Sequence, residues 1–170
     1  MNVMMLKEDG LTPLLTGLKS AVRRSLLEAM GQHMVESATR AFSMAALRPA
    51  PWAPRRGVEK HPLLRKTGTL WRSLRVVQAT ELSVTVGSDR RYAAIHQLGG
   101  QVPAMVIRPR AKKALFWPGA AHPMRKVRRP AVSIPARPFF PIVQGRLTVR
   151  EERALREVVR LRVQGAGGRR

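Results

Sequence analysis

The chain has 170 residues, the length of one ordinary domain, and 44% of them are apolar, which is enough for a modest core. It contains no cysteine, so disulfide scaffolds, thiol catalysis and cysteine-ligated metals are excluded. Thirty-two Lys and Arg against ten Asp and Glu give a net charge of +22, which favours polyanionic or acidic partners. No uncharged stretch approaches the roughly 20 apolar residues of a membrane span. The first residues do not resemble a signal peptide, so we expect a soluble intracellular product.

The first predicted element is a long N-terminal helix. Thr12 suits the N-cap and Pro13 the first helical position. Apolar residues then recur at steps of three and four up to about Ala46, which places them on one face. They are Leu11, Leu15, Leu18, Val22, Leu26 and Ala29, with His33 on the same face. Because glycine costs about 1 kcal/mol inside a helix, we expect a bend or a close contact at Gly31.

A Pro-rich linker and a series of short elements are predicted next. Residues 49–62 contain four prolines, and Thr67 can then cap a short helix over 68–74. Two strands, at 76–77 and 82–86, are then expected with a turn at 79–81 between them, and residues 92–98 form either a helix or a strand. Two further strands, at 102–107 and 114–117, are expected to be joined by a basic hairpin tip at 108–113. A loop at 118–130 and a strand at 131–134 complete this part of the chain.

A second long helix is predicted near the end of the chain. Thr148 and Glu151 have the spacing of a capping box, and the apolar pattern continues to about Val163. We expect a single α+β domain over 1–164, with a basic loop at about 108–130, and a flexible basic tail over 165–170. The fold class is a long N-terminal helix packed on a small antiparallel sheet, plus a C-terminal helix.

The residues give little support for an enzyme. The four histidines stand singly, without metal-ligand spacing, and no nucleophile elbow or phosphate-binding loop is present. Residues 61–150 hold only two acids, Glu81 and Asp89, whereas a two-metal nuclease needs several converging carboxylates. We therefore expect no catalytic residue, no metal and no cofactor.

The basic residues are the candidate binding residues. Residues 61–150 hold seventeen basic side chains and two acidic ones. Eight of the basic residues form an acid-free stretch: Arg108, Arg110, Lys112, Lys113, Arg125, Lys126, Arg128 and Arg129. Such a stretch can neutralise phosphates without reading sequence, or it can meet an acidic protein. Phe116 and Trp117 fall in a predicted strand, so we expect them in the core rather than stacking on bases.

Four short motifs carry a resemblance to a known family. Residues 64–74 (LRKTGTLWRSL) match L-x-x-T-G-x-L-x-x-S; 84–88 (VTVGS) with 92–100 (YAAIHQLGG) match V-x-V-G-S and Y-A-x-I-H-Q-x-G-G; 134–140 (IPARPFF) match I-P-A-R-P-F-L; and 52–55 (WAPR) match a W-x-P segment. Together, in this order and over about residues 10–145, they resemble the Mu-like phage virion morphogenesis (tail completion) proteins.

The motif residues have structural interpretations of their own. Gly87 and Gly99–Gly100 permit turns with positive φ, and Tyr92, Ile95 and Leu98 have the spacing to anchor a short helix on the sheet. Arg137, between two prolines, is placed for a buried or intersubunit ion pair. The motif residues expected to serve structure or assembly are Thr67, Gly68, Leu70, Ser73, Gly87, Tyr92, His96, Gly99, Gly100, Pro135, Arg137, Pro138 and Phe139.

The resemblance implies a non-enzymatic virion protein of the neck. Such proteins form a ring, commonly hexameric, at the head-proximal end of the tail, and genome DNA passes through the lumen. The implied partners are further copies of the chain, a tail terminator or tail tube protein, head-connector proteins and DNA bound without sequence preference, with no membrane. Leu14, Met30 and Met34 are extra apolar residues that a ring neighbour would cover. The alternative is a monomeric, sequence-nonspecific nucleic-acid-binding protein.

Overall fold

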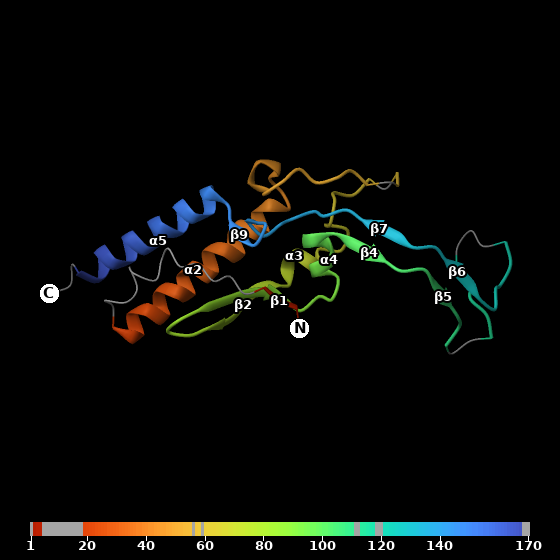
Figure 1. Cartoon of the computed structure of the whole chain (residues 1–170), viewed down its shortest axis with the longest axis horizontal. Helices are drawn as coiled ribbons and strands as arrows, with labels where there is room; N and C mark the ends of the chain where they lie inside the picture. The colour runs from red at the N-terminus through yellow and green to blue at the C-terminus, as the bar shows by residue number, and fades with distance from the viewer. Residues whose placement is uncertain are drawn as a thin grey trace.

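The computed structural model describes residues 2–4, 19–55, 57–58, 60–110, 113–117 and 121–167. Its helices are α2 (Ser20–Ala41), the 3-10 turn η1 (Ala45–Leu47), α3 (Thr69–Arg72), α4 (Ala93–Leu98) and α5 (Val149–Gly167). Its strands are β1 (Asn2–Met4), β2 (Leu74–Ala79), β3 (Val84–Ser88), β4 (Gly100–Val102), β5 (Met105–Ile107), β6 (Val127–Arg129), β7 (Val132–Ile134), β8 (Ile142–Val143) and β9 (Arg146–Leu147). These elements form an α+β body from which a long arm extends (Figure 1).

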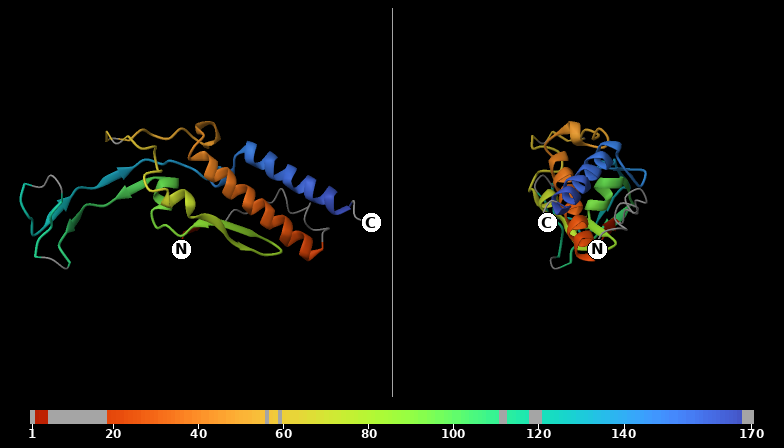
Figure 2. Two further views of the ribbon diagram at one scale, coloured as in Figure 1. Left: turned by 180° about the vertical axis from the view of Figure 1, so that it is seen from behind. Right: turned by 90° about the vertical axis from the view of Figure 1, so that its left-hand side faces the viewer.

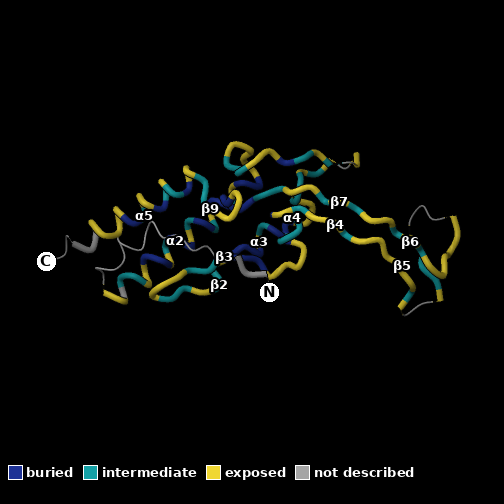
Figure 3. The backbone as a smooth tube through the Cα atoms, viewed as in Figure 1, coloured by how far each residue is buried: buried dark blue, intermediate teal, exposed yellow. Residues whose placement is uncertain are grey.

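The body has three layers with α2 in the middle. A three-stranded antiparallel sheet in the order β1-β3-β2 packs against one side of α2, and α5 packs against another (Figure 2). The buried residues concentrate in α2 and in the segments around it (Figure 3). Because α2 is covered by two layers, apolar residues beyond one stripe are buried along it. Met30 and Met34, expected to face a neighbouring subunit, are each only 5% exposed inside this core, so that expectation was wrong.

Gly31 lies where α2 crosses the sheet. A Cβ added there would be 2.6 Å from Val84 Cγ2 and 3.0 Å from Val76 Cγ2. The close contact expected from the sequence is therefore confirmed, and it brings the helix backbone against the β2–β3 hairpin. Leu14 and the expected cap residues Thr12 and Pro13 lie outside the described residues.

Gly31→Ala is expected to destabilise the protein by about 1–3 kcal/mol, because overpacking a close contact outweighs the better helix propensity of alanine. Urea unfolding followed by circular dichroism measures the change. In a Val84→Ala background the nearest methyl group is absent and only Val76 Cγ2, at 3.0 Å, remains close, so the same substitution should cost much less. Equal losses in both backgrounds would contradict this explanation.

The arm is a two-stranded antiparallel ribbon. Strand β4 pairs with β7, with Gly100 opposite Ile134, and β5 pairs with β6, with Met105 opposite Arg129. Prolines 103 and 130 lie between the two strand pairs and lack the N–H that a continuous ladder needs. Most of the described arm residues are exposed (Figure 3).

The strand pairing predicted for the arm was wrong. Residues 114–117 were expected to be a strand, but only a single bridge joins Leu115 to Met124. The partner of β5 is instead β6, which lies inside the region expected to be a loop, and the predicted strand at 102–107 is interrupted by Pro103. The residues between β5 and β6 thus form a tip much longer than the expected 108–113. Ribbon register depends on contacts across the tip, which local alternation does not encode.

Several other predicted elements agree with the structure, and the ends of both long helices differ from it. The short helix, the β2–β3 hairpin and the strand at 131–134 are confirmed, and residues 93–98 are helical. Helix α2 ends at Ala41, and η1 replaces its expected last turn, while α5 continues to Gly167, so the first residues of the expected tail are helical. Residues 168–170 lie outside the described part. None of the described helices is long and apolar enough to cross a membrane.

Candidate functional site

The family-like motifs meet at the base of the arm, and Gln97 on α4 is their central contact. Its Oε1 accepts hydrogen bonds from the backbone N–H groups of Phe139 and Phe140, both at 3.0 Å, and its Nε2 donates to the Phe140 carbonyl at 3.4 Å. The side chain is 4% exposed. One amide thus satisfies three backbone groups of a buried segment, which explains why a polar residue lies in the core.

Gln97→Met should cost about 2–5 kcal/mol, because it keeps the shape but leaves two buried N–H groups without an acceptor. Chemical denaturation monitored by tryptophan fluorescence measures the loss. Gln101→Met, at an exposed position of β4, is the matched control and should change stability by about 0.5 kcal/mol or less. Similar effects for the two substitutions would mean that the Gln97 hydrogen bonds contribute little.

Arg137 and Trp52 join the Pro-rich segment to the same base. Arg137 donates from Nε to the Ala53 carbonyl at 2.9 Å and from Nη2 to the Pro54 carbonyl at 3.1 Å. Trp52 Nε1 donates to the Pro138 carbonyl at 2.7 Å. Among the described residues Arg137 thus makes hydrogen bonds to carbonyl oxygens in place of the buried ion pair, and the intersubunit ion pair stays a prediction. The start of the expected linker is therefore attached to the body through Trp52, which is buried, whereas Val58 is fully exposed.

Gly99 and His96 bring α4 against the returning chain. The backbone N–H of Arg137 donates to the His96 carbonyl at 2.7 Å. Gly99 has φ +72°, and a Cβ there would be 2.8 Å from the Ala136 nitrogen, so glycine is required for both conformation and space. Gly100 also has a positive φ, of +154°. Gly87 differs from the expectation of a turn, because it lies within β3 opposite Arg75.

The His96 ring is half-buried on α4. Burial, and next the nearby Arg137 charge, lower the pKa of His96 below its ordinary value. The imidazole is therefore neutral at pH 7, and its buried Nδ1 has no hydrogen-bond partner in the described part of the chain. Its ring packs edge-on against Tyr92, with centroids 6.0 Å apart. These contacts suit a structural residue.

The expected anchoring face of α4 was wrong. Tyr92 is 41% and Leu98 72% exposed, whereas Ala93 and Gln97 are buried. The apolar spacing favoured a face with Tyr92, Ile95 and Leu98. In a helix this short, however, the buried face is the one whose polar groups find hydrogen-bond partners in the core. Gln97 stands inside the H-Q-x-G-G motif, and its spacing of four from Ala93 was the signal for the correct face.

The first motif is joined to the second by two buried serines. Ser73 Oγ donates to the Leu70 carbonyl at 2.6 Å and lies 2.7 Å from Ser88 Oγ, which accepts from the Arg90 N–H at 3.1 Å. Leu70 is 4% exposed, in the core. Thr67 Oγ1 accepts from the Thr69 N–H at 3.4 Å, beside Gly68 at φ +72°. These motif residues hold α3 against the end of β3.

The eight candidate basic residues lie on the arm, apart from Lys112, which is outside the described residues. Arg108, Arg110, Lys113, Arg125, Lys126 and Arg128 are exposed, and Arg129 is half-buried. No ion pair among the described residues involves any of these seven. The chain has no acidic residue between Asp89 and Glu151, so nothing within the arm neutralises them.

Phe116 and Trp117 were expected in the core, but they are 70% and 42% exposed at the arm tip. They border a groove of about 360 Å³, lined also by Ile107, Leu115, Val127, Arg128, Arg129 and Pro130. The expectation failed because residues 114–117 have no full strand partner that would bring them under a second layer. The arm therefore presents apolar and basic side chains together.

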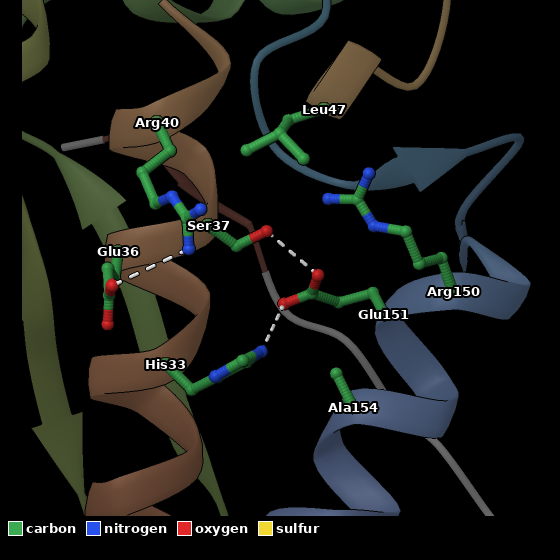
Figure 4. Close-up of a pocket in the computed structure, with 8 residues that line it drawn as sticks. All are labelled: His33, Glu36, Ser37, Arg40, Leu47, Arg150, Glu151 and Ala154. Carbon is green, nitrogen blue, oxygen red and sulfur yellow. Dashed lines mark hydrogen bonds and ion pairs between the residues drawn. The ribbon is translucent and has the colours of Figure 1, made fainter. Parts of the chain in front are cut away.

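A second cavity, of about 420 Å³, lies between α2 and α5 (Figure 4). Glu151, only 2% exposed, accepts a hydrogen bond at Oε2 from Ser37 Oγ at 2.8 Å. Its Oε1 lies 3.4 Å from His33 Nε2. The capping box is only half formed: the Glu151 N–H lies 3.4 Å from Thr148 Oγ1, but the carboxylate turns to α2. The sequence missed this contact, because only packing brings the two helices together.

This cluster does not form a nucleophile-activating triad. The Ser37 hydroxyl donates to the carboxylate and not to the imidazole, whereas an activated serine needs a base at its own proton. Across the described ranges, no group of three or more His, Asp or Glu residues could hold a metal ion. Ser37, His33 and Glu151 instead tie α5 to α2.

Three comparisons with known proteins bear on identity. A family model described as the phage virion morphogenesis family matches residues 6–164. Comparisons with the curated proteins and with the solved structures found no match. The match covers nearly the whole chain, including α2, strands β2 and β3, the arm and most of α5. This protein therefore belongs to the phage virion morphogenesis family, and its role lies in building the phage virion.

Proposed function

We propose that the protein is a non-enzymatic tail-completion or neck protein that forms a ring at the head-proximal end of the phage tail. The ring, hexameric as in the proteins that the motifs resemble, finishes the tail and makes it competent to join a DNA-filled capsid. Family membership supports the coarse role in virion assembly. The neck position, the ring and the partners are the further content of the proposal.

The arm is the observation that carries this proposal. A two-stranded ribbon with an exposed, acid-free tip extends well beyond the body (Figure 1). Within one chain, exposed apolar and basic side chains on such a projection serve no folding purpose that the described contacts reveal. A subunit that reaches a neighbouring subunit or layer would use the arm in this way, since extended ribbons contact partners without enlarging the core.

The charge supports proximity to DNA in the lumen. Each subunit carries +22, and a ring multiplies this field around its axis. Basic side chains that line a channel would neutralise phosphates and read no sequence, as passage of any genome segment requires. The same field favours docking to an acidic neighbouring ring.

Sizing chromatography with light scattering tests the ring. The proposal expects a particle mass that is a multiple of the 19.0 kDa chain. Measuring the affinity for DNA at increasing salt concentrations then distinguishes the ring protein from the alternative, a monomeric nucleic-acid-binding protein. A monomer whose DNA affinity falls steeply with salt would overturn the ring and favour the nucleic-acid-binding protein. A map of the assembled particle would identify the ring's layer and neighbours.

A further inference from the structure

We propose that the arm tip is a docking site for an acidic protein segment with an aromatic or aliphatic anchor, contributed by another protein of the virion. The anchor would occupy the groove beside Phe116 and Trp117, and the acidic side chains would pair with the surrounding arginines and lysines. The virion context rests on the proposed function, whereas the chemistry of the site rests on the arm alone.

Several apolar side chains of the arm are exposed. Besides Phe116 and Trp117, the exposed side chains of the arm include Met105, Val106, Ile107 and Met124, each between 36% and 48% exposed. Of these residues Ile107, Phe116 and Trp117 line the groove of about 360 Å³, together with Leu115 and Val127. An exposed apolar groove rimmed by charge is typical of protein interaction sites. Aromatic residues and arginine together are also enriched at their centres.

The positive charge of the arm tip favours a negatively charged partner. Arg128 and Arg129 line the groove, and the other five described basic residues lie within three positions of it along the chain. None of the seven has an ion pair among the described residues. Arg129 lines the groove, and its buried Nε has no hydrogen-bond partner in the described part of the chain. A buried donor of this kind is costly until an acceptor reaches it, and a carboxylate is the acceptor that suits guanidinium best.

Duplex DNA would bind the basic part of this surface but would leave its apolar part exposed. Phosphates would pair with the basic residues, but the bases of a duplex are stacked on one another and would leave Phe116 and Trp117 in water. Stacking on these rings would require unpaired bases. A protein segment with an apolar anchor covers both parts at once, so it fits the described surface better than duplex DNA.

The described part of a second copy offers few acids without a partner. In the described residues, Glu36, Asp89, Glu152 and Glu157 already lie within 4 Å of arginines of the same chain. Glu151 is buried against α2. The other exposed acids of the described part, Glu28 on α2 and Glu81 in the β2–β3 turn, belong to the body. The acidic occupant is therefore expected from a different protein.

Photocrosslinking in assembled phage tests the inference. Phe116 is replaced by p-benzoylphenylalanine, the purified particles are irradiated, and the adduct is sequenced by mass spectrometry. Trp117 provides a second position for the same reagent, and Leu82, which is 83% exposed on the β2–β3 hairpin, is the control. The expected adduct is a net-acidic segment of another virion protein, absent from the Leu82 control. Adducts to DNA, to a second copy of this chain or to a neutral or basic segment would overturn the inference, as would no adduct beyond that control.

A double substitution separates this inference from the ring. Phe116→Ser with Trp117→Ser should leave the particle mass in light scattering unchanged and lower the yield of infectious phage by about tenfold or more, the effect of losing one or two interface anchors. A double variant that no longer forms the ring would place the aromatic residues within the ring itself, and a normal yield would remove their docking role. Either result overturns the inference. If the wild-type protein is monomeric, that result would contradict the proposed ring but not the docking site on the arm tip.

Discussion

Phe139→Ala is expected to lower the free energy of unfolding by about 3–5 kcal/mol, the usual cost of removing a buried phenylalanine. Phe139 is 1% exposed, and its ring centroid lies 5.2 Å from those of both Phe42 and Phe140. Phe42 in turn packs edge-on against Trp52 at 5.6 Å. This aromatic cluster joins the end of α2, the Pro-rich segment and the base of the arm, so a cavity there weakens three parts of the fold.

Urea unfolding of Phe139→Ala is best compared with that of Phe116→Ala. Phe116 is 70% exposed, so its truncation should change stability by about 0.5 kcal/mol or less. The pair removes the same atoms from a buried and an exposed site of one chain. Comparable losses at the two positions would contradict the placement of Phe139 in the core and of Phe116 on the surface.

The second large effect concerns assembly and not stability. Replacing Arg108, Arg110, Arg125 and Arg128 by alanine should reduce the yield of infectious phage by roughly ten- to hundredfold. Four exposed charges at a few tenths to 1 kcal/mol each supply about 1–3 kcal/mol of docking free energy per subunit. All four side chains are exposed, so the unfolding free energy should hardly change. Plaque titres and counts of joined particles by electron microscopy measure the effect.

A control with the same loss of charge distinguishes the arm from general electrostatics. Lys19, Arg24, Arg153 and Arg162 are exposed on or beside the long helices, and none of them has an ion pair among the described residues. Their replacement by alanine lowers the net charge equally but leaves the arm intact. Near-normal yields are expected from this variant. If both variants assemble alike, the arm has no special role in joining.

Features that depend on interactions between neighbouring residues could be predicted from the sequence, whereas features that depend on distant residues could not. Helical periodicity, the linker prolines and strand alternation are local signals, and they gave the α+β class, the short helix, the β2–β3 hairpin and the close contact at Gly31. The motifs also led to the family, since their order along the chain is a property of sequence alone. The basic stretch was found by counting charges.

The structure decided which residues those elements bring together. Gln97 is buried because backbone groups of Phe139 and Phe140, more than forty positions away, satisfy its amide. Glu151 turns from its expected cap toward Ser37, 114 positions away. The arm pairs β5 with β6 across a tip whose length no local pattern encodes, and this leaves Phe116 and Trp117 exposed. By itself the sequence determined the fold class, the family and the basic stretch. Only the tertiary structure, through long-range hydrogen bonds and strand register, decided that the motifs form the base of an arm and that its tip is apolar as well as basic.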